Sequence, residues 1–307
     1  MIIVVGANGF LGRHLCAFLE RGRHPAVAVS RQPDRRFFEG YAPSLHVMDE
    51  AAFASAEGRA VLRDAQAVVY LTWRSVPATF SSEPWREIPE NVEPATQFFL
   101  RVAEAAPQAK IVFLSSGGTV YGAEGTRPKT ELSPTHPISA YGLGKLLAEE
   151  ALSFAGRTKS VPFSILRVSN AVGRWQTNEA QGIVGVALRA ARAGTPVKLY
   201  GGGMQVRDFV DAEDVARAIY GASTDTRNLN ATWNVGSGTG LRIADLIESI
   251  SGVIGRPVPV EHAPARNLDV PYVVLDCDRI AEDLGWRAEI PIERSILELW
   301  RAIGEPL

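Results

Sequence analysis

The sequence predicts an α/β fold in which a doubly wound parallel sheet is joined to a smaller C-terminal domain. Short β-branched runs without polar alternation recur along the first half, at Ile2–Val5, Ala26–Ser30, Leu45–Met48, Val68–Leu71, Ile111–Leu114 and Phe163–Val168. Strands with this pattern are buried on both faces. Between them the apolar residues have helical spacing, as in Leu11–Leu19. Alternating strands and helices favour a parallel sheet with helices on both faces.

After residue 170 this alternation changes. We expect a helix, a glycine-rich turn, a second helix and one more strand, at Ile183–Ala193, Gly201–Gly203, Asp214–Tyr220 and Trp233–Val235. The change predicts two interleaved domains. Residues 1–170 with 208–236 would form the first domain, and residues 171–207 with 237–307 would form a substrate-binding domain.

Composition narrows the classes of function. The 307 residues are 46% hydrophobic and 21% charged, as in an ordinary globular protein, and the net charge of −2 offers no basic face for nucleic acid. No apolar run reaches the roughly 20 residues of a membrane span, and no secretory signal opens the chain, so we expect a cytoplasmic protein without a membrane partner. Cys16 and Cys277 are far apart, which argues against a disulfide or a metal site.

A glycine loop directly follows the first expected strand and opens a helix. Gly6 and Gly9 keep the turn tight and leave room for a phosphate, and Gly12 lets the helix pack closely on the strand. In this context the loop predicts a Rossmann dinucleotide site with the pyrophosphate at the helix N-terminus. The candidate cofactor contacts in the loop are Gly6, Asn8, Gly9, Phe10, Leu11 and Gly12.

The end of the second strand indicates which dinucleotide is bound. A carboxylate there would bind the adenosine ribose and repel a 2′-phosphate. This chain has Ser30 and Arg31 instead, and a hydroxyl with a guanidinium suits a phosphate, so NADP is favoured over NAD. Asp49, after the third strand, is a candidate contact for the adenine. A solvated surface charge is the alternative for Arg31 and for Asp49.

A phenol and an ammonium share one helix face at Tyr141 and Lys145. The strand ending near Ser116 places a hydroxyl at the sheet edge where ligands bind in such folds. A free tyrosine, with a pKa of about 10, is a poor base at neutral pH, and a lysine cation favours its phenolate. We therefore predict hydride transfer by a catalytic set of Ser116, Tyr141 and Lys145, with Tyr141 and Lys145 also at the cofactor.

Together these motifs resemble the extended short-chain dehydrogenase/reductase family, in its nucleotide-sugar epimerase, dehydratase and reductase branch. The resemblance covers nearly the whole chain and rests on the glycine loop, Asn91, the segment Ser115–Gly122 and the Tyr-x-x-x-Lys pair. It implies cofactor contacts at Leu71, Thr72 and Asn91, and a homodimer formed partly by the helices that carry Asn91 and Tyr141.

The resemblance also implies a nucleotide-diphosphate sugar as substrate. Asn170 resembles the family asparagine that reaches the substrate phosphates, and Arg207 and Arg266 resemble its diphosphate-binding arginines. Thr119 is a further candidate contact. Trp73 departs from the small residues usual beside the cofactor, so it narrows the cleft or only fills the core.

The residues after Ser116 indicate the type of reaction. Dehydratases and decarboxylases of the branch typically carry an acid there, whereas this chain has Gly117, Gly118 and Thr119. What remains is hydride transfer at the sugar C4, as reduction of a 4-keto sugar or as epimerisation. Ser30 and Arg31 tilt the prediction toward an NADPH-dependent reductase, whereas the glycine pair resembles a form found among epimerases.

Two alternatives stay open. An NADPH-dependent reductase of a hydrophobic or phenolic ketone would share the N-terminal half but would not need diphosphate-binding arginines. A non-catalytic NADP-sensing protein on the same fold would lose the catalytic pair, which this chain keeps at Tyr141 and Lys145.

Overall fold

The computed structural model describes residues 1–176, 182–265 and 270–304. A seven-stranded sheet lies at its centre, in the order β10-β6-β5-β4-β1-β2-β3, with every neighbouring pair parallel. The strands are β1 (Ile2–Val5), β2 (Ala26–Ser30), β3 (His46–Asp49), β4 (Ala67–Tyr70), β5 (Lys110–Ser116), β6 (Phe163–Val168) and β10 (Ala231–Val235). The predicted doubly wound sheet is confirmed, and its order reverses between β1 and β4, where such sheets bind ligands.

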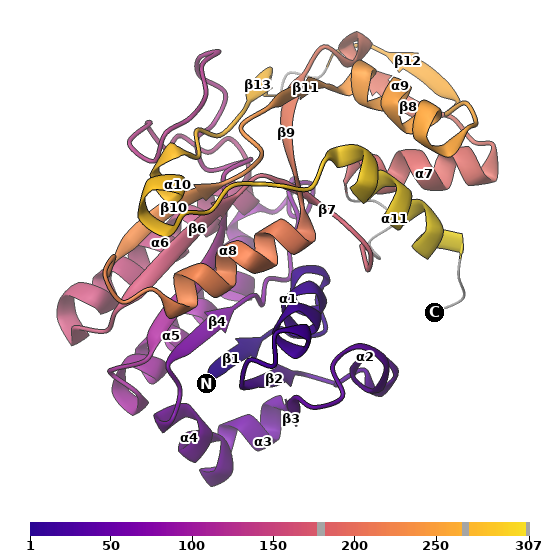
Figure 1. Cartoon of the computed structure of the whole chain (residues 1–307). Coiled ribbons are helices and arrows are strands. Elements are labelled where there is room, and N and C mark those ends of the chain that lie inside the picture. The colour runs from indigo at the N-terminus through magenta and orange to yellow at the C-terminus, as the bar shows by residue number, and fades with distance from the viewer. Residues whose placement is uncertain (177–181, 266–269, 305–307) are drawn as a thin grey trace.

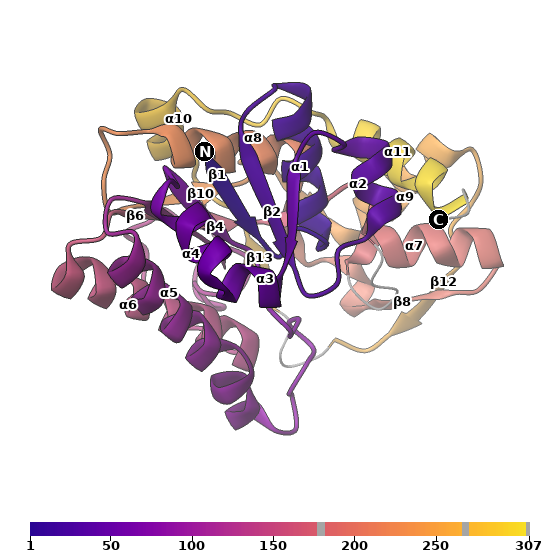
Figure 2. The same ribbon diagram turned by 90° about the horizontal axis from the view of Figure 1, so that it is seen from below.

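Helices cover both faces of this sheet (Figures 1 and 2). On one face lie α1 (Phe10–Arg21) and α8 (Ala212–Thr224), and on the other lie α5 (Glu93–Ala105) and α6 (Ala140–Lys159). Leu15 and Ile219 bury the first pair of helices against the sheet, and Phe99 and Leu152 bury the second. Each such side chain contributes about 1.5–3 kcal/mol to folding.

Three short helices link β2, β3 and β4: α2 (Arg35–Tyr41), α3 (Glu50–Ala54) and α4 (Ala56–Arg63). Each begins after a side chain that accepts a backbone N–H of its first turn. These caps are Asp34, Asp49 and Ser55. The helices are too short to show the apolar periodicity by which longer helices are predicted.

The smaller part of the molecule has its own sheet and core. β7 (Asn170–Val172), β9 (Val206–Asp211), β11 (Gly240–Arg242) and β13 (Tyr272–Val273) pair in one sheet, and β8 (Val197–Tyr200) pairs with β12 (Val260–Ala263). Helices α7 (Ile183–Ala193), α9 (Ile243–Ile254) and α11 (Ile292–Gly304) bury Leu188, Leu246 and Leu299 together. Helix α10 (Asp278–Leu284) lies beside β10 (Figure 1).

The chain passes between the two parts more than once. It leaves the large sheet after β6, forms β7 to β9, returns through α8 and β10, and leaves again at β11. The predicted division at residues 170, 208 and 236 stays a prediction. Strand β9 pairs with β7 in the smaller sheet, while α8 packs against α1 beside the large one.

No helix within the described ranges is both long and apolar enough to cross a bilayer. Among the same residues, no group of three or more His, Cys, Asp or Glu side chains is placed to hold a metal ion. Cys16 and Cys277 are free thiols, and Cys16 is buried in the core beside α8.

Candidate active site

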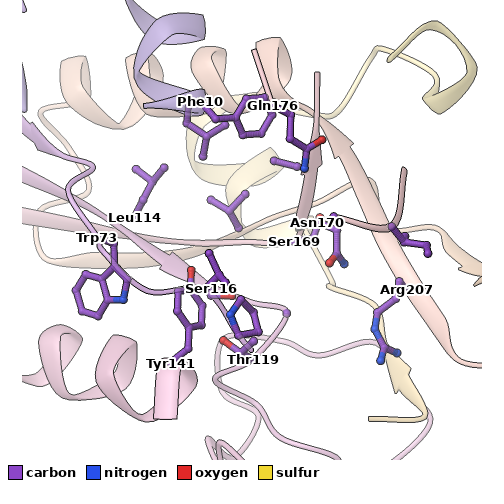
Figure 3. A pocket seen from close by; sticks show the side chains of 18 of the residues that line it. Phe10, Trp73, Leu114, Ser116, Thr119, Tyr141, Ser169, Asn170, Gln176 and Arg207 are labelled. Carbon is purple, nitrogen blue, oxygen red and sulfur yellow. The ribbon is translucent and has the colours of Figure 1, made fainter. Parts of the chain in front are cut away.

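A cavity of about 810 Å³ lies along the carboxyl edge of the large sheet, between that sheet and the smaller part. It collects many of the predicted site residues from both halves of the chain (Figure 3). The predicted residues that line it are Gly6, Gly9, Phe10, Leu11, Gly12, Leu71, Trp73, Ser116, Thr119, Tyr141, Lys145, Asn170 and Arg207. Asn8, Ser30, Arg31, Asp49, Thr72 and Asn91 lie outside this lining, and Arg266 is outside the described residues.

The glycine loop has the geometry of an anion site. Gly6 has a φ of +92°, and a Cβ at Gly12 would lie 2.3 Å from the carbonyl oxygen of Gly6. Helix α1 starts after Gly9 without a side-chain cap and without an acidic residue in its first turn. Its first N–H groups and the positive end of its dipole therefore face the cavity without competition from a protein carboxylate. This arrangement fits the pyrophosphate of a dinucleotide.

Asn8 anchors the loop. Its Oδ1 accepts the N–H of Asp34 at 3.1 Å, and its Nδ2 donates to the carbonyl oxygen of Gln32. Arg13, which sequence reasoning did not select, pairs with Asp34 at 2.7 Å and also donates to the Asn8 carbonyl. The predicted cofactor contact Asn8 is thus used in tying the glycine loop to the segment after β2.

The end of β2 carries a buried hydroxyl followed by an exposed arginine, Ser30 and Arg31. The Ser30 Oγ has no hydrogen-bond partner among the described residues. A buried hydroxyl without a protein partner can bind a ligand at low cost, because the ligand satisfies it. Asp49 instead caps α3, accepting the N–H of Ala52 at 2.7 Å.

Ser116 and Tyr141 meet across the cavity wall. β5 ends at Ser116, and Tyr141 stands in the first turn of α6, whose start is fixed by Ser139 accepting the N–H of Gly142 at 3.1 Å. The Ser116 side chain lies close enough to Tyr141 to affect the pKa of the phenol. Burial raises the pKa of Tyr141 to about 12, against the polar influence of Ser116, which lowers it. At neutral pH the phenol therefore carries its proton and can donate it.

The ammonium of Lys145 is held by a carbonyl and a ring. Its Nζ donates to the carbonyl oxygen of Leu114 at 2.8 Å and lies 3.9 Å from the centroid of the Trp73 ring. Burial lowers the pKa of Lys145 to about 7. The ammonium is 5.7 Å from the Tyr141 ring centroid and is not among the groups that shift the pKa of Tyr141. The expectation that Lys145 favours the phenolate stays a prediction.

At the far side of the cavity, Asn170 and Arg207 come from β7 and β9 of the smaller sheet (Figure 3). Asn170 Nδ2 donates to the carbonyl oxygen of Asp208 at 2.8 Å, and Arg207 Nη1 donates to that of Val206 at 2.9 Å. Thr119 Oγ1 is buried without a hydrogen-bond partner among the described residues. These groups can bind an anionic or polyhydroxylated ligand.

Asn91 lies in a π-helical turn, Ile88–Val92, that leads into α5. Its Oδ1 accepts the N–H of Arg74 at 2.7 Å, so it fixes the segment after β4 rather than lining the cavity. Sequence reasoning missed two further residues of this region. Gln176 lines the cavity, and the buried Glu87 lies behind the wall formed by Trp73. No motif marks either residue.

The glycine loop, the switch-point cavity and the Ser116–Tyr141–Lys145 cluster define a dinucleotide-dependent oxidoreductase. The chain belongs to the NAD dependent epimerase/dehydratase family, whose model matches residues 2–236. This confirms the predicted place in the extended short-chain dehydrogenase/reductases and the prediction of an enzyme.

Individual relatives match along almost their whole length. A putative UDP-glucose 4-epimerase of Methanocaldococcus jannaschii is 27% identical over 96% of this chain and 96% of its own. A dTDP-4-dehydro-6-deoxyglucose reductase of Escherichia coli is 25% identical over 98% and 97%. The solved structure of MoeE5 in complex with UDP-glucuronic acid and NAD is 27% identical, with a TM-score of 0.82 over 99% of this chain and 98% of that one.

Proposed function

We propose that this enzyme transfers a hydride between a nicotinamide dinucleotide and C4 of the sugar in a nucleoside-diphosphate sugar. The observation that carries the proposal is the neighbouring pair of Ser116 and Tyr141. It lines the same cavity as the glycine loop on one side and Arg207 on the other. A dinucleotide at the loop and a diphosphate at Arg207 would leave the sugar between them, at the phenol.

Each catalytic side chain has a definite task in this proposal. Ser116 donates a hydrogen bond to the C4 oxygen, and Tyr141 gives that oxygen a proton during reduction or removes one during oxidation. Lys145 supplies positive charge beside the reacting atoms. The bound dinucleotide supplies or accepts the hydride. Gly117, Gly118 and Thr119 follow Ser116, so no carboxylate stands there to assist loss of water.

Net reduction of a 4-keto sugar with NADPH is the direction we favour. Its support is the end of β2, where Ser30 Oγ is buried without a partner and Arg31 is exposed, a combination suited to a 2′-phosphate. The reductase from Escherichia coli is a relative with this type of activity in its name. Epimerisation with tightly held NAD is the second candidate, supported by the 4-epimerase relative and by NAD in the MoeE5 complex.

Identification of any dinucleotide that copurifies with the protein separates these two directions. The protein is purified, denatured and its released nucleotides are identified by mass spectrometry. Stoichiometric NAD would support the epimerase and overturn the reductase preference. An empty protein that binds NADPH more tightly than NADH, and loses this preference in Arg31→Ser, would support the reductase.

Turnover is then measured on two substrates. A dTDP-4-keto-6-deoxy sugar with NADPH tests reduction through the loss of NADPH absorbance, and UDP-glucose tests epimerisation through formation of UDP-galactose. Arg207→Met should raise the KM for either substrate. Activity on apolar ketones that Arg207→Met leaves unchanged would favour the non-sugar reductase. A protein that binds NADPH but turns over none of these substrates would favour the sensing protein.

We also propose a cytoplasmic homodimer. Leu143, Leu147 and Phe154 lie on one face of α6 and are exposed, and Trp85 and Ile88 before α5 are exposed as well. Two copies of this face would cover one another. Light scattering after gel filtration should give a dimer mass for the wild type and a monomer mass for Phe154→Asp. A monomeric wild type would overturn this part of the proposal.

A further inference from the structure

Glu87 is a buried carboxylate that the reaction described above does not use. Only 1% of its surface is exposed. Its Oε1 accepts three hydrogen bonds, from Trp73 Nε1 at 2.9 Å, Ser75 Oγ at 2.8 Å and Asn91 Nδ2 at 3.0 Å. Its Oε2 finds no donor among the described residues. Burying such a group costs free energy, so its place in the wall calls for a compensating role.

The hydrogen bond to Trp73 fixes the plane of the indole ring. The face of that ring receives the Lys145 ammonium at 3.9 Å, and its plane stands at 83° to the Tyr141 ring, with 6.5 Å between ring centroids. Trp73 therefore touches the catalytic lysine with its face. It also approaches the catalytic tyrosine (Figure 3). In this orientation the indole meets the Glu87 carboxylate with its N–H and the Lys145 ammonium with its face.

Glu87 also packs against the helix that carries the catalytic pair. A Cβ added at Gly144, between Tyr141 and Lys145, would lie 2.4 Å from Cγ of Glu87. The absence of a side chain at Gly144 is thus what lets the carboxylate approach α6. The charge of Glu87 reaches both catalytic groups, since it acts on the pKa of Tyr141 and on that of Lys145.

We propose that Glu87 is a positioning residue that acts through Trp73: it holds the indole so that its face fixes the Lys145 ammonium beside Tyr141. The proposal rests on the proposed hydride transfer, because it assigns Glu87 to the Lys145 of that reaction. Without the carboxylate the indole turns, and the ammonium keeps the carbonyl of Leu114 and the more distant rings of Phe113 and Tyr141. A desolvated ammonium gains substantially from an indole face, so losing that contact loosens it.

The first test needs no turnover. In protein labelled with ¹⁵N-tryptophan, the indole N–H resonance of Trp73 is assigned by its loss in Trp73→Phe. We expect this proton to be protected from water exchange in the wild type and in Glu87→Gln, which keeps an oxygen acceptor. It should shift and exchange faster in Glu87→Ala. The exposed acid Glu93, on α5, provides the matched control Glu93→Gln, in which the resonance stays in place. An unchanged resonance in Glu87→Ala overturns the proposal.

The second test is kinetic. Glu87→Ala should lower kcat by about tenfold or more, the effect of one hydrogen bond to a charged group, with little change in the KM for the nucleotide sugar. Trp73→Phe keeps a ring face but cannot donate to Glu87, so Glu87→Ala should add little in that background. Losses that multiply in the double variant, or a change confined to KM, contradict the proposal. If Glu87→Ala does not fold, an unchanged kcat in Trp73→Phe contradicts the proposal instead.

These two tests separate failure of this inference from failure of the proposed function. A wild type that turns over no nucleotide sugar contradicts the proposed function. An unchanged Trp73 resonance in Glu87→Ala contradicts the role of Glu87, whatever the substrate is.

Discussion

Arg167 and Glu149 form a buried ion pair, with Nη2 of the arginine 2.7 Å from Oε2 of the carboxylate. Arg167 lies on β6 and Glu149 on α6, the helix of Tyr141, and Glu149 also accepts a hydrogen bond from Ser115, the neighbour of Ser116. The pair therefore fixes the helix and the strand end that carry the catalytic phenol and hydroxyl relative to one another.

Arg167→Met should reduce the free energy of unfolding by about 3–5 kcal/mol, because it leaves the Glu149 carboxylate buried without its cation. Urea denaturation followed by circular dichroism measures this loss. Arg157→Met, at an exposed position of α6, is the control and should change the free energy of unfolding by less than about 0.5 kcal/mol. Equal stabilities of the two variants would contradict the structural role of the pair.

Tyr141→Phe should lower kcat by about 10²–10⁴-fold, the range for loss of a general acid–base group. Dinucleotide affinity should change little, since the ring remains and only the hydroxyl is lost. Stopped-flow hydride transfer and a fluorescence titration with NADPH measure the two quantities. Tyr41→Phe, which removes an exposed hydroxyl away from the cavity, should behave as wild type.

The pH profile of kcat/KM should show the deprotonation of Lys145. Because burial lowers the pKa of Lys145 to about 7, the free enzyme loses this cation as the pH rises through that value, and kcat/KM should fall with it. Lys145→Arg keeps a charge throughout this range, so its residual activity should lack the descending limb near neutrality. A limb of the same midpoint in both proteins would assign it to another group.

His14 should make the fold sensitive to mild acid. Burial lowers its pKa from 6.5 to about 4, so between these values the unfolded chain binds a proton that the folded chain does not. The stability is fully present above pH 6.5 and decreases as the pH falls toward 4, by about 3 kcal/mol in total. Thermal unfolding of His14→Gln should lack this component of the pH dependence.

Gly12→Ala should abolish dinucleotide binding and destabilise the protein, because the new Cβ would lie 2.3 Å from the carbonyl oxygen of Gly6. Calorimetric titration with NADPH and thermal unfolding test both effects. At Gly40, in α2, a Cβ meets nothing within 4 Å, so Gly40→Ala should bind normally and gain up to about 1 kcal/mol of stability. Normal binding by Gly12→Ala would exclude the glycine loop as the cofactor site.

Much of the framework is predictable because its signals are local. β1, β2, β6 and α7 have the bounds expected from β-branched runs and helical spacing, while β3 and β4 are offset by one residue. The strand predicted at Ile111–Leu114 is longer in the structure, Lys110–Ser116, and the added polar residues Lys110 and Ser115 are buried. Ser116, Tyr141 and Lys145 lie along one cavity because their motif positions follow from strand ends and helix periodicity.

Other features depend on contacts that no local pattern encodes. β7 and β11 are three residues long, too short for an apolar period. The sequence predicts Asp49 as an adenine contact or as a solvated surface charge, whereas in the structure it caps α3. In the sequence Glu87 cannot be distinguished from a surface acid. In the structure it lies at the start of the π-helical turn and accepts a hydrogen bond from Trp73.

The repeated passage of the chain between its two parts separates the proposed catalytic residues from the proposed diphosphate contacts along the sequence. The glycine loop and the three reactive side chains all precede residue 146, whereas Asn170 and Arg207 come after β6. Under the roles proposed for these residues, substitutions in the later segment would change substrate binding and leave the proton donor in place. A chimera that keeps the first half and borrows the second from a relative would inherit its chemistry from one parent and its choice of substrate from the other.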